Sequence, residues 1–426
     1  MLNRFKGNIL KIIYLHQYFN TPDMSGGTRS YEMAKRMVSA GHEVHMVTSL
    51  REEQKQHTDW FTTDEAGIKV HWYPVPYSNN MSYFQRIKAF FSFAFAAKKK
   101  AASLQGDVVF ATSTPLTIAL PAGFTSRKLK VPMVFEVRDL WPEMPIAMGV
   151  LKNPIAIYLA KKLEVWAYKN SSAIVALSPG MKQGVTKTGF AEDKVVVIPN
   201  GSDNNEFSND QELAQSFLSN RPWLEGAPLL IYAGTFGRVN GVDYIVHVAK
   251  KLKEINSNVK ILLVGEGAEK DNAISLAKKL DVFESIVFFE NALPKKEMPA
   301  LFNAATMTSN LVIDLPEARA NSANKFFDSL AAGKPILLNH AGWMDEVISH
   351  YDCGISAWSK NLKEVAITLD QKMNDEKWLT KAGHSAKKIA MKYFDRDKLA
   401  SDLLLILASI VESKQFNNKI KDTFIE

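Results

Sequence analysis

A lysine and an aspartate three positions apart, Lys325 and Asp328, are the residues best suited to chemistry in this sequence. They lie in the segment NSANKFFDSLAAGKP, where Gly333 and Pro335 are expected to end a helix. Because residues three apart share one helical face, the ammonium could hold phosphate oxygens while the carboxylate accepts hydrogen bonds from sugar hydroxyls. The polar start around Ser322 favours an N-cap, and free N–H groups there also attract anions. An ordinary surface pair is the alternative.

Three glycine-rich turns follow predicted strands. Gly26 and Gly27 precede the first predicted helix, Arg238 lies in AGTFGRVNG, and Glu266 lies in VGEG. Glycine lets the backbone approach a ligand closely, and a guanidinium group matches phosphate oxygens. The first of these turns, at Gly26 and Gly27, lacks G-x-G-x-x-G and the P-loop lysine, so neither NAD nor P-loop chemistry is indicated there. A plain glycine turn and a solvated Arg238 remain the alternatives.

A charged segment, EVRDLWPE, follows a buried apolar strand. Charged groups at such a position are costly to desolvate unless they pair or bind a ligand. The functional interpretation places Arg138 and Asp139 against a polar substrate. The alternative is an ion pair of Arg138 with Asp139 or Glu143 that shapes the loop.

Short apolar runs alternate with helical patterns and are expected to position these residues. Continuous apolar runs suit strands covered on both faces, and their alternation with helices indicates βαβ units. The chain therefore predicts an α/β fold of two doubly wound, Rossmann-like domains facing a cleft: residues 1–205, residues 206–395, and a helix and tail at 396–426 that packs back on the first domain. Strands are expected at 11–19, 43–48, 107–113, 131–137, 173–177, 195–198, 229–233, 259–264, 285–289, 306–312 and 335–339, and helices at 28–40, 154–169 and throughout 360–411.

Composition and charge narrow the class of protein. The 426 residues carry a net charge of +7, with 25 Lys and Arg against 16 Asp and Glu in residues 1–205, and 27 against 29 in the rest. The single Cys353 permits no internal disulfide, which favours a cytoplasmic protein. No signal peptide or spanning helix is expected, and no nucleic-acid motif accompanies the basic excess.

The segment 83–102 could touch a membrane. Its apolar stripe of Phe84, Ile87, Phe91 and Phe95 lies beside several basic residues, so it could dock on the anionic cytoplasmic face of an inner membrane. A core helix with a basic outer edge is the alternative.

Taken together, the order and spacing of several segments resemble those of GT-B glycosyltransferases of family 4. These segments are GGT, AGHEVHMVTS, VIPNGSDNNEF, YAGTFGRVNG, LLVGEG, VFFENALPKKEMPALFNAA and FFDSLAAGKPI, while EVRDLWPE and NSANKFFDSLAAGKP look most similar to bacterial O-antigen and capsule transferases of N-acetyl-L-fucosamine and related amino sugars. The resemblance implies retaining transfer from a UDP-sugar, without a metal or cofactor, to a saccharide acceptor linked to undecaprenyl diphosphate.

The resemblance also implies roles for individual residues. Asp139, beside Arg138, would orient or deprotonate the acceptor hydroxyl, and Asp328 would bind ribose. The remaining donor-binding residues would be Gly26, Gly27, Arg238, Glu266, Asn291, Leu293, Ser322 and Lys325. Four positions depart from the family pattern. Ala320 stands where relatives have a sugar-binding glutamate, Thr235 and Asn240 stand where they have arginine and lysine, and Arg138 stands where many have histidine. A UDP-sugar 2-epimerase and a non-catalytic sugar-nucleotide-binding subunit are the competing hypotheses.

Overall fold

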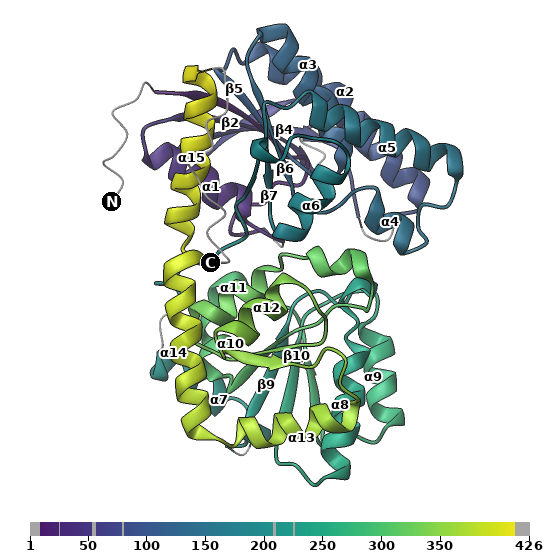
Figure 1. The fold of residues 1–426 in the computed structure, drawn as a ribbon, viewed down its shortest axis with the longest axis vertical. Helices are drawn as coiled ribbons and strands as arrows, with labels where there is room; N and C mark the ends of the chain where they lie inside the picture. The colour runs from purple at the N-terminus through teal and green to yellow at the C-terminus, as the bar shows by residue number, and fades with distance from the viewer. Residues whose placement is uncertain are drawn as a thin grey trace. The chain divides into compact units, whose positions relative to one another are not determined.

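A computed structural model describes residues 9–24, 26–52, 57–78, 81–207, 210–224 and 226–413. The chain divides into two compact units (Figure 1). Unit 1 comprises Met1–Pro199 and Asp397–Glu426, and unit 2 comprises Asn200–Arg396.

Unit 1 is built on an α/β sheet. Its described strands are β1 (Lys11–Leu15), β2 (Glu43–Leu50), β3 (Phe61–Glu65), β4 (Ile68–Pro74), β5 (Val108–Thr112), β6 (Met133–Val137), β7 (Ala173–Ala176) and β8 (Val195–Val197). They are ordered β3-β4-β2-β1-β5-β6-β7-β8, and every neighbouring pair is parallel except β3 with β4. The predicted parallel strands are confirmed, whereas the β3–β4 hairpin was not predicted.

Helices from both ends of the chain complete the core of unit 1. The helices of this unit are α1 (Arg29–Ser39), α2 (Tyr83–Ser103), α3 (Ala119–Leu129), α4 (Glu143–Ala147), α5 (Pro154–Lys169), α6 (Pro179–Lys187) and α15 (Arg396–Ser413). Leu403, Leu407 and Ile410 of α15 pack in the same core as Ile12 and Tyr14 of β1. The predicted return of the last helix to the first domain therefore matches the packing of α15.

Unit 2 repeats the α/β plan with a parallel sheet. Its described strands, ordered β11-β10-β9-β12-β13-β14, are β9 (Leu229–Ala233), β10 (Lys260–Val264), β11 (Val287–Glu290), β12 (Met307–Asn310), β13 (Ile336–Leu338) and β14 (Gly354–Ser356). The helices are α7 (Gln211–Ser219), α8 (Asp243–Glu254), α9 (Lys270–Lys279), α10 (Met298–Ala304), α11 (Asn324–Ala331), α12 (Trp343–His350), α13 (Leu362–Met373) and α14 (Glu376–Tyr393).

The first boundary between the units falls after Pro199 rather than after residue 205. Residues beyond it already bond within unit 2. The side-chain amide of Asn200 donates to the Ser322 carbonyl at 2.6 Å, and the guanidinium of Arg396 donates to the Gly201 carbonyl at 2.7 Å. The Pro-, Gly- and Asn-rich segment therefore enters unit 2 earlier than its composition suggested.

Two glycine turns of unit 2 pack directly on each other, and this predicts a stability effect. Gly265 has φ +153°, and a Cβ placed there would lie 1.8 Å from the Gly234 carbonyl oxygen. We expect Gly265→Ala to destabilise unit 2 by about 2–3 kcal/mol, because it combines backbone strain with a clash against main chain. Gly226→Ala is the control: its φ is +69° but no atom lies within 4 Å, so only the left-handed strain of about 1 kcal/mol remains. Urea unfolding followed by tryptophan fluorescence measures both, and equal losses would contradict the prediction.

Candidate functional site

Lys325, in the first turn of α11, holds a buried amine in unit 2. Among the described residues its Nζ has no hydrogen-bond partner. The Nζ lies 4.0 Å from the centroid of the Tyr232 ring, and a Cβ on Gly234 would approach it to 2.8 Å. Burial lowers the pKa of Lys325 to about 7. A desolvated amine beside the backbone of a glycine turn, at the carboxyl end of β9, is suited to receive an anion.

Asp328, one turn later on α11, does not neutralise Lys325. Its carboxylate accepts a hydrogen bond from the Ser202 hydroxyl at 2.8 Å. Burial raises the pKa of Asp328 to about 6, and the charge of Arg396 limits the rise. Lys325 and Asp328 are both partly buried, and they do not bond to each other. The alternative of an ordinary surface ion pair is therefore wrong.

The start of α11 differs from the prediction. The N-cap residue is Ala323, which has no side chain able to cap the helix, so the predicted polar N-cap is wrong. Ser322 instead bonds to the first residue of unit 2: its Oγ accepts from the Asn200 backbone N–H at 3.4 Å. The first N–H groups of α11 consequently receive no side-chain cap, which suits an anion more than a satisfied helix end would.

Lys270 joins two of the predicted donor-binding residues. Its Nζ donates to Glu266 Oε1 at 2.9 Å, to Asn291 Oδ1 at 2.8 Å and to the Glu290 carbonyl at 3.1 Å. The turns after β10 and β11 are thereby fixed against each other, with the neighbouring Leu293 half-buried. Sequence reasoning did not single out Lys270, although its i,i+4 spacing from Glu266 is a detectable signal.

The other glycine-turn residues are more open. Arg238 begins the short helix η4 (Arg238–Asn240) and is exposed. In unit 1, Gly26 has φ +125°, and the Asn20 side-chain amide that packs against it donates to the Gly27 carbonyl at 3.3 Å. The two cations of unit 2 differ in environment: the Arg238 side chain is exposed, whereas the Lys325 amine is buried and has no hydrogen-bond partner among the described residues.

A buried ion pair in unit 1 organises the EVRDLWPE segment. Glu136, fully buried at the end of β6, accepts from Arg29 at 2.8 and 3.0 Å and from the Thr112 hydroxyl at 2.7 Å. Burial acts to raise the pKa of Glu136, but the charges of Arg29 and Arg138 outweigh it and hold the pKa below its ordinary value. The partner of this carboxylate comes from α1, which the sequence did not indicate.

Arg138 and Asp139 follow this ion pair at the carboxyl end of β6. The Arg138 backbone N–H donates to Ser113 Oγ at 3.0 Å, and its guanidinium lies 3.4 Å from His16 Nε2. His16 directly follows β1 and is buried; burial first, then the charges of Arg138 and Arg51, lower its pKa well below the ordinary value, so the ring is neutral. The sequence placed His16 inside the predicted strand at 11–19 and did not indicate that it lies beside Arg138.

Asp139 has the electrostatics of a weak base. Surrounding protein atoms raise the pKa of its carboxyl to about 6, while the Arg138 charge and a hydrogen bond with Thr114 limit the rise. The residue still presents surface to solvent, so it is accessible to an acceptor hydroxyl. Three neighbouring strands, β1, β5 and β6, thus bring His16, Thr114 and Asp139 to one edge of the sheet.

Within the described ranges, no group of three or more His, Cys, Asp or Glu side chains could hold a metal ion. The carboxylates described above are paired or hydrogen-bonded instead: Glu136 with Arg29, Glu266 with Lys270, and Asp328 with the Ser202 hydroxyl.

Comparison with known proteins identifies both halves of the chain. Residues 26–201 match the glycosyl transferase 4-like domain, and residues 217–389 match glycosyl transferases group 1. An uncharacterized glycosyltransferase of Methanocaldococcus jannaschii is 23% identical over 255 residues, which are 59% of this chain. The match spans 63% of that relative, which is less than two thirds of its length.

Solved structures agree on the fold. HepE of Anabaena in complex with UDP and glucose has a TM-score of 0.69 at 16% identity, over 94% of this chain and all of that one. WaaG, a glycosyltransferase involved in lipopolysaccharide biosynthesis, has a TM-score of 0.67 at 15% identity, over 94% and 99% of the two chains. The two matched domains and the fold of the two units agree with each other. The chain therefore belongs to the GT-B glycosyltransferases, with a glycosyl transferase 4-like domain followed by a group 1 domain.

Proposed function

We propose that this protein is a retaining glycosyltransferase that moves a sugar from a UDP-sugar donor to a saccharide acceptor. The observation that carries the proposal is the buried, unpartnered amine of Lys325 beside Gly234, in the unit matched by the group 1 domain. A diphosphate there would supply the anion that the amine lacks. The Anabaena neighbour, crystallised with UDP and glucose, supports a uridine nucleotide as the donor group.

The transfer needs the negative charge on the leaving diphosphate to be stabilised. Lys325 and the uncapped N–H groups of α11 supply that stabilisation without any metal, and Arg238 adds an exposed guanidinium from the turn after β9. Asp328 binds the ribose hydroxyls in exchange for its bond to Ser202. The glycosidic bond to the diphosphate breaks while the acceptor oxygen bonds to the anomeric carbon on the same face, so that the anomeric configuration is retained.

The proton of the acceptor hydroxyl is taken up by a carboxylate of unit 1. Asp139, whose pKa is about 6, is largely ionised at neutral pH and accessible, so it can accept the proton of the attacking hydroxyl. Arg138, supported by Ser113 and the neutral His16, holds a positive charge beside it.

The donor sugar we propose is an N-acetylated 6-deoxy amino sugar, and the acceptor a lipid-linked saccharide of surface polysaccharide synthesis. Ala320, at the end of the short helix η6 (Pro316–Ala320), has no side-chain carboxylate for sugar hydroxyls, which suits a donor with fewer of them. The involvement of WaaG in lipopolysaccharide biosynthesis supports the acceptor class.

Thermal unfolding with UDP, GDP and ADP, each with and without EDTA, tests the nucleotide. We expect UDP at about 100 times its Kd to stabilise the protein by about 2.7 kcal/mol, raising the melting midpoint by several degrees. GDP and ADP should act less, and EDTA should change nothing. Equal shifts by all three nucleotides, or a shift that EDTA removes, would contradict a metal-independent UDP site.

Product analysis separates the competing functions. Incubation with UDP-N-acetylamino sugars and saccharide acceptors should give an α-linked product from an α-linked donor, read by NMR. Conversion of the donor to its 2-epimer without an acceptor would instead identify an epimerase. UDP binding without turnover for any acceptor would favour the non-catalytic subunit.

A further inference from the structure

The helix α2 carries large apolar side chains that unit 1 does not cover. Phe84 is 77% exposed, Phe95 67% and Phe91 39%. Ala89, Phe93, Ala94 and Ala97 of the same helix are buried against the unit, so the helix is anchored by one face and presents phenylalanines on another. The alternative that the stripe at 83–102 is a core face is therefore wrong for these three rings.

The charges around these rings have one sign. Helix α3 packs against α2. Neither helix contains an acidic residue. Together they carry seven basic ones: Arg86, Lys88, Lys98, Lys99, Lys100, Arg127 and Lys128. A pair of packed helices with only basic charges and with exposed aromatic rings is unusual for a face that meets only water.

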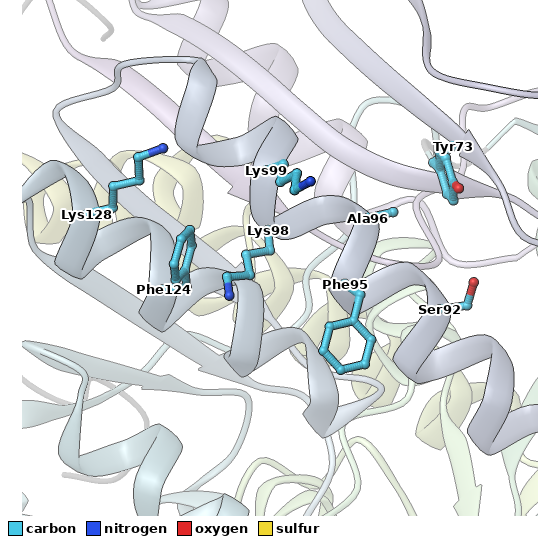
Figure 2. Close-up of a pocket in the computed structure, with 8 residues that line it drawn as sticks. All are labelled: Tyr73, Ser92, Phe95, Ala96, Lys98, Lys99, Phe124 and Lys128. Carbon is cyan, nitrogen blue, oxygen red and sulfur yellow. The ribbon is translucent and has the colours of Figure 1, made fainter.

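A cavity of about 980 Å³ opens between these two helices. Its walls combine aromatic rings with lysines, as Figure 2 shows: Tyr73, Phe95 and Phe124 with Lys98, Lys99 and Lys128. The Nζ of Lys98 lies 4.0 Å from the centroid of the Phe124 ring. Within the described part of the chain none of the three lysines has a carboxylate within 4.0 Å, so their charges are available to an external anion.

We propose that this α2–α3 surface docks on an anionic lipid bilayer. The lysine-lined cavity takes the phosphates of lipid headgroups, and Phe84, Phe91 and Phe95 enter the boundary between headgroups and acyl chains. The docking is peripheral, since no described helix is both long and apolar enough to cross a membrane. The proposal depends on the surface of unit 1 alone and not on the transfer chemistry of the donor site.

Vesicle sedimentation with purified full-length protein tests the surface. The protein should bind phosphatidylcholine vesicles that contain phosphatidylglycerol and not vesicles of phosphatidylcholine alone. The triple variant Lys98→Gln, Lys99→Gln, Lys128→Gln should bind the anionic vesicles about 100-fold more weakly, because each basic residue near such a surface contributes about fivefold. The double variant Phe84→Ser, Phe95→Ser should also bind more weakly while keeping the melting midpoint of the parent, because both rings are exposed.

A charge-matched control uses three exposed lysines elsewhere, Lys35→Gln, Lys187→Gln and Lys388→Gln. It should bind like the parent. Equal weakening in the control and the cavity variant would overturn the proposal, because binding would then follow net charge. Failure of the parent to bind anionic vesicles, with protection of the cavity lysines by soluble glycerol phosphate, would overturn it in favour of a small phosphorylated ligand. Thermal stabilisation by UDP, measured in parallel, tests the donor site independently, so that a failure of membrane binding can be distinguished from a failure of the proposed activity.

Discussion

Replacement of Lys325 by methionine is expected to weaken UDP binding by about 100- to 1000-fold, since losing the partner of a buried charge costs several kcal/mol of binding. Methionine has a similar unbranched length and fills the space over Tyr232, so the loss reports on charge rather than on packing. The free variant should be more stable than the parent near pH 7, because an amine without a partner is costly to bury. Calorimetric titration with UDP and thermal unfolding without ligand measure the two effects.

The pH dependence of UDP binding provides an independent readout. With a pKa of about 7, Lys325 is largely protonated below that pH in the free protein. The diphosphate favours the charged form and raises the pKa in the complex, so above pH 7 binding must take up a proton. Affinity should therefore fall as pH rises above 7, by up to about tenfold per pH unit, with proton uptake visible as a buffer-dependent heat. Lys325→Met should abolish this dependence.

The effect of pH on folding stability runs in the opposite direction to its effect on UDP affinity. Because burial holds the pKa of Lys325 below its unfolded value of 10.5, the unfolded state binds more protons between the two values. The contribution of Lys325 is most destabilising below about pH 7 and is relieved as pH rises toward 10.5. The stability gained by Lys325→Met should shrink over the same range.

Lys334 provides the matched control. It is also a lysine of unit 2 whose pKa burial lowers, to about 8, but its Nζ donates to the Asn303 carbonyl at 2.9 Å. Lys334→Met should leave UDP affinity unchanged and lower stability, because it strands a buried acceptor. If both variants lost UDP affinity equally, the assignment of the diphosphate to Lys325 would be wrong.

Asp139→Asn is expected to lower kcat by about 100- to 10,000-fold, the usual contribution of a positioned general base. The amide keeps the size of the carboxyl and its contact with Thr114 but cannot accept the acceptor proton. Stabilisation by UDP should be unchanged, because Asp139 belongs to unit 1 and the UDP site is assigned to unit 2. The rate should be measured with a labelled donor at saturating acceptor.

The pH–rate profile distinguishes a base from a structural residue. A base must be ionised, so activity of the parent should fall as pH drops below about 6, following the raised pKa of Asp139. That acidic limb should disappear from the residual activity of Asp139→Asn. Asp193→Asn, an exposed carboxyl of unit 1, is the control and should keep both rate and profile. Unchanged turnover in Asp139→Asn would remove this residue from the mechanism.

Much of the fold was predictable because parallel strands leave a strong signal. Runs such as IIYL and LLIYA are apolar at every position, which marks strands covered on both faces. The hairpin of β3 and β4 was missed for the opposite reason. FTTDE is polar and half-exposed, and its turn uses Ala66 and Gly67, both with positive φ, rather than the Asn-Gly or Asp-Gly that usually marks such a turn.

The candidate site was predictable only for residues that lie close together in the sequence. Lys325 and Asp328 could be placed together because helical periodicity joins residues three apart. Arg29 and Glu136 are 107 residues apart and meet only through the strand order of the sheet. The same holds for His16 and Arg138, which are 122 residues apart. A single sequence contains no signal for pairs brought together by tertiary structure.

The return of α15 to unit 1 has a consequence for the order in which the chain can fold during synthesis. Unit 2 is continuous, so all its strands and core helices have been made once residue 396 has left the ribosome. Unit 1 begins first, but Leu403, Leu407 and Ile410 of its core are made last. Until they arrive, the core that holds the buried residues of β1 and α1 lacks the apolar side chains of α15. The half of the protein that is translated first is therefore the half that finishes folding second.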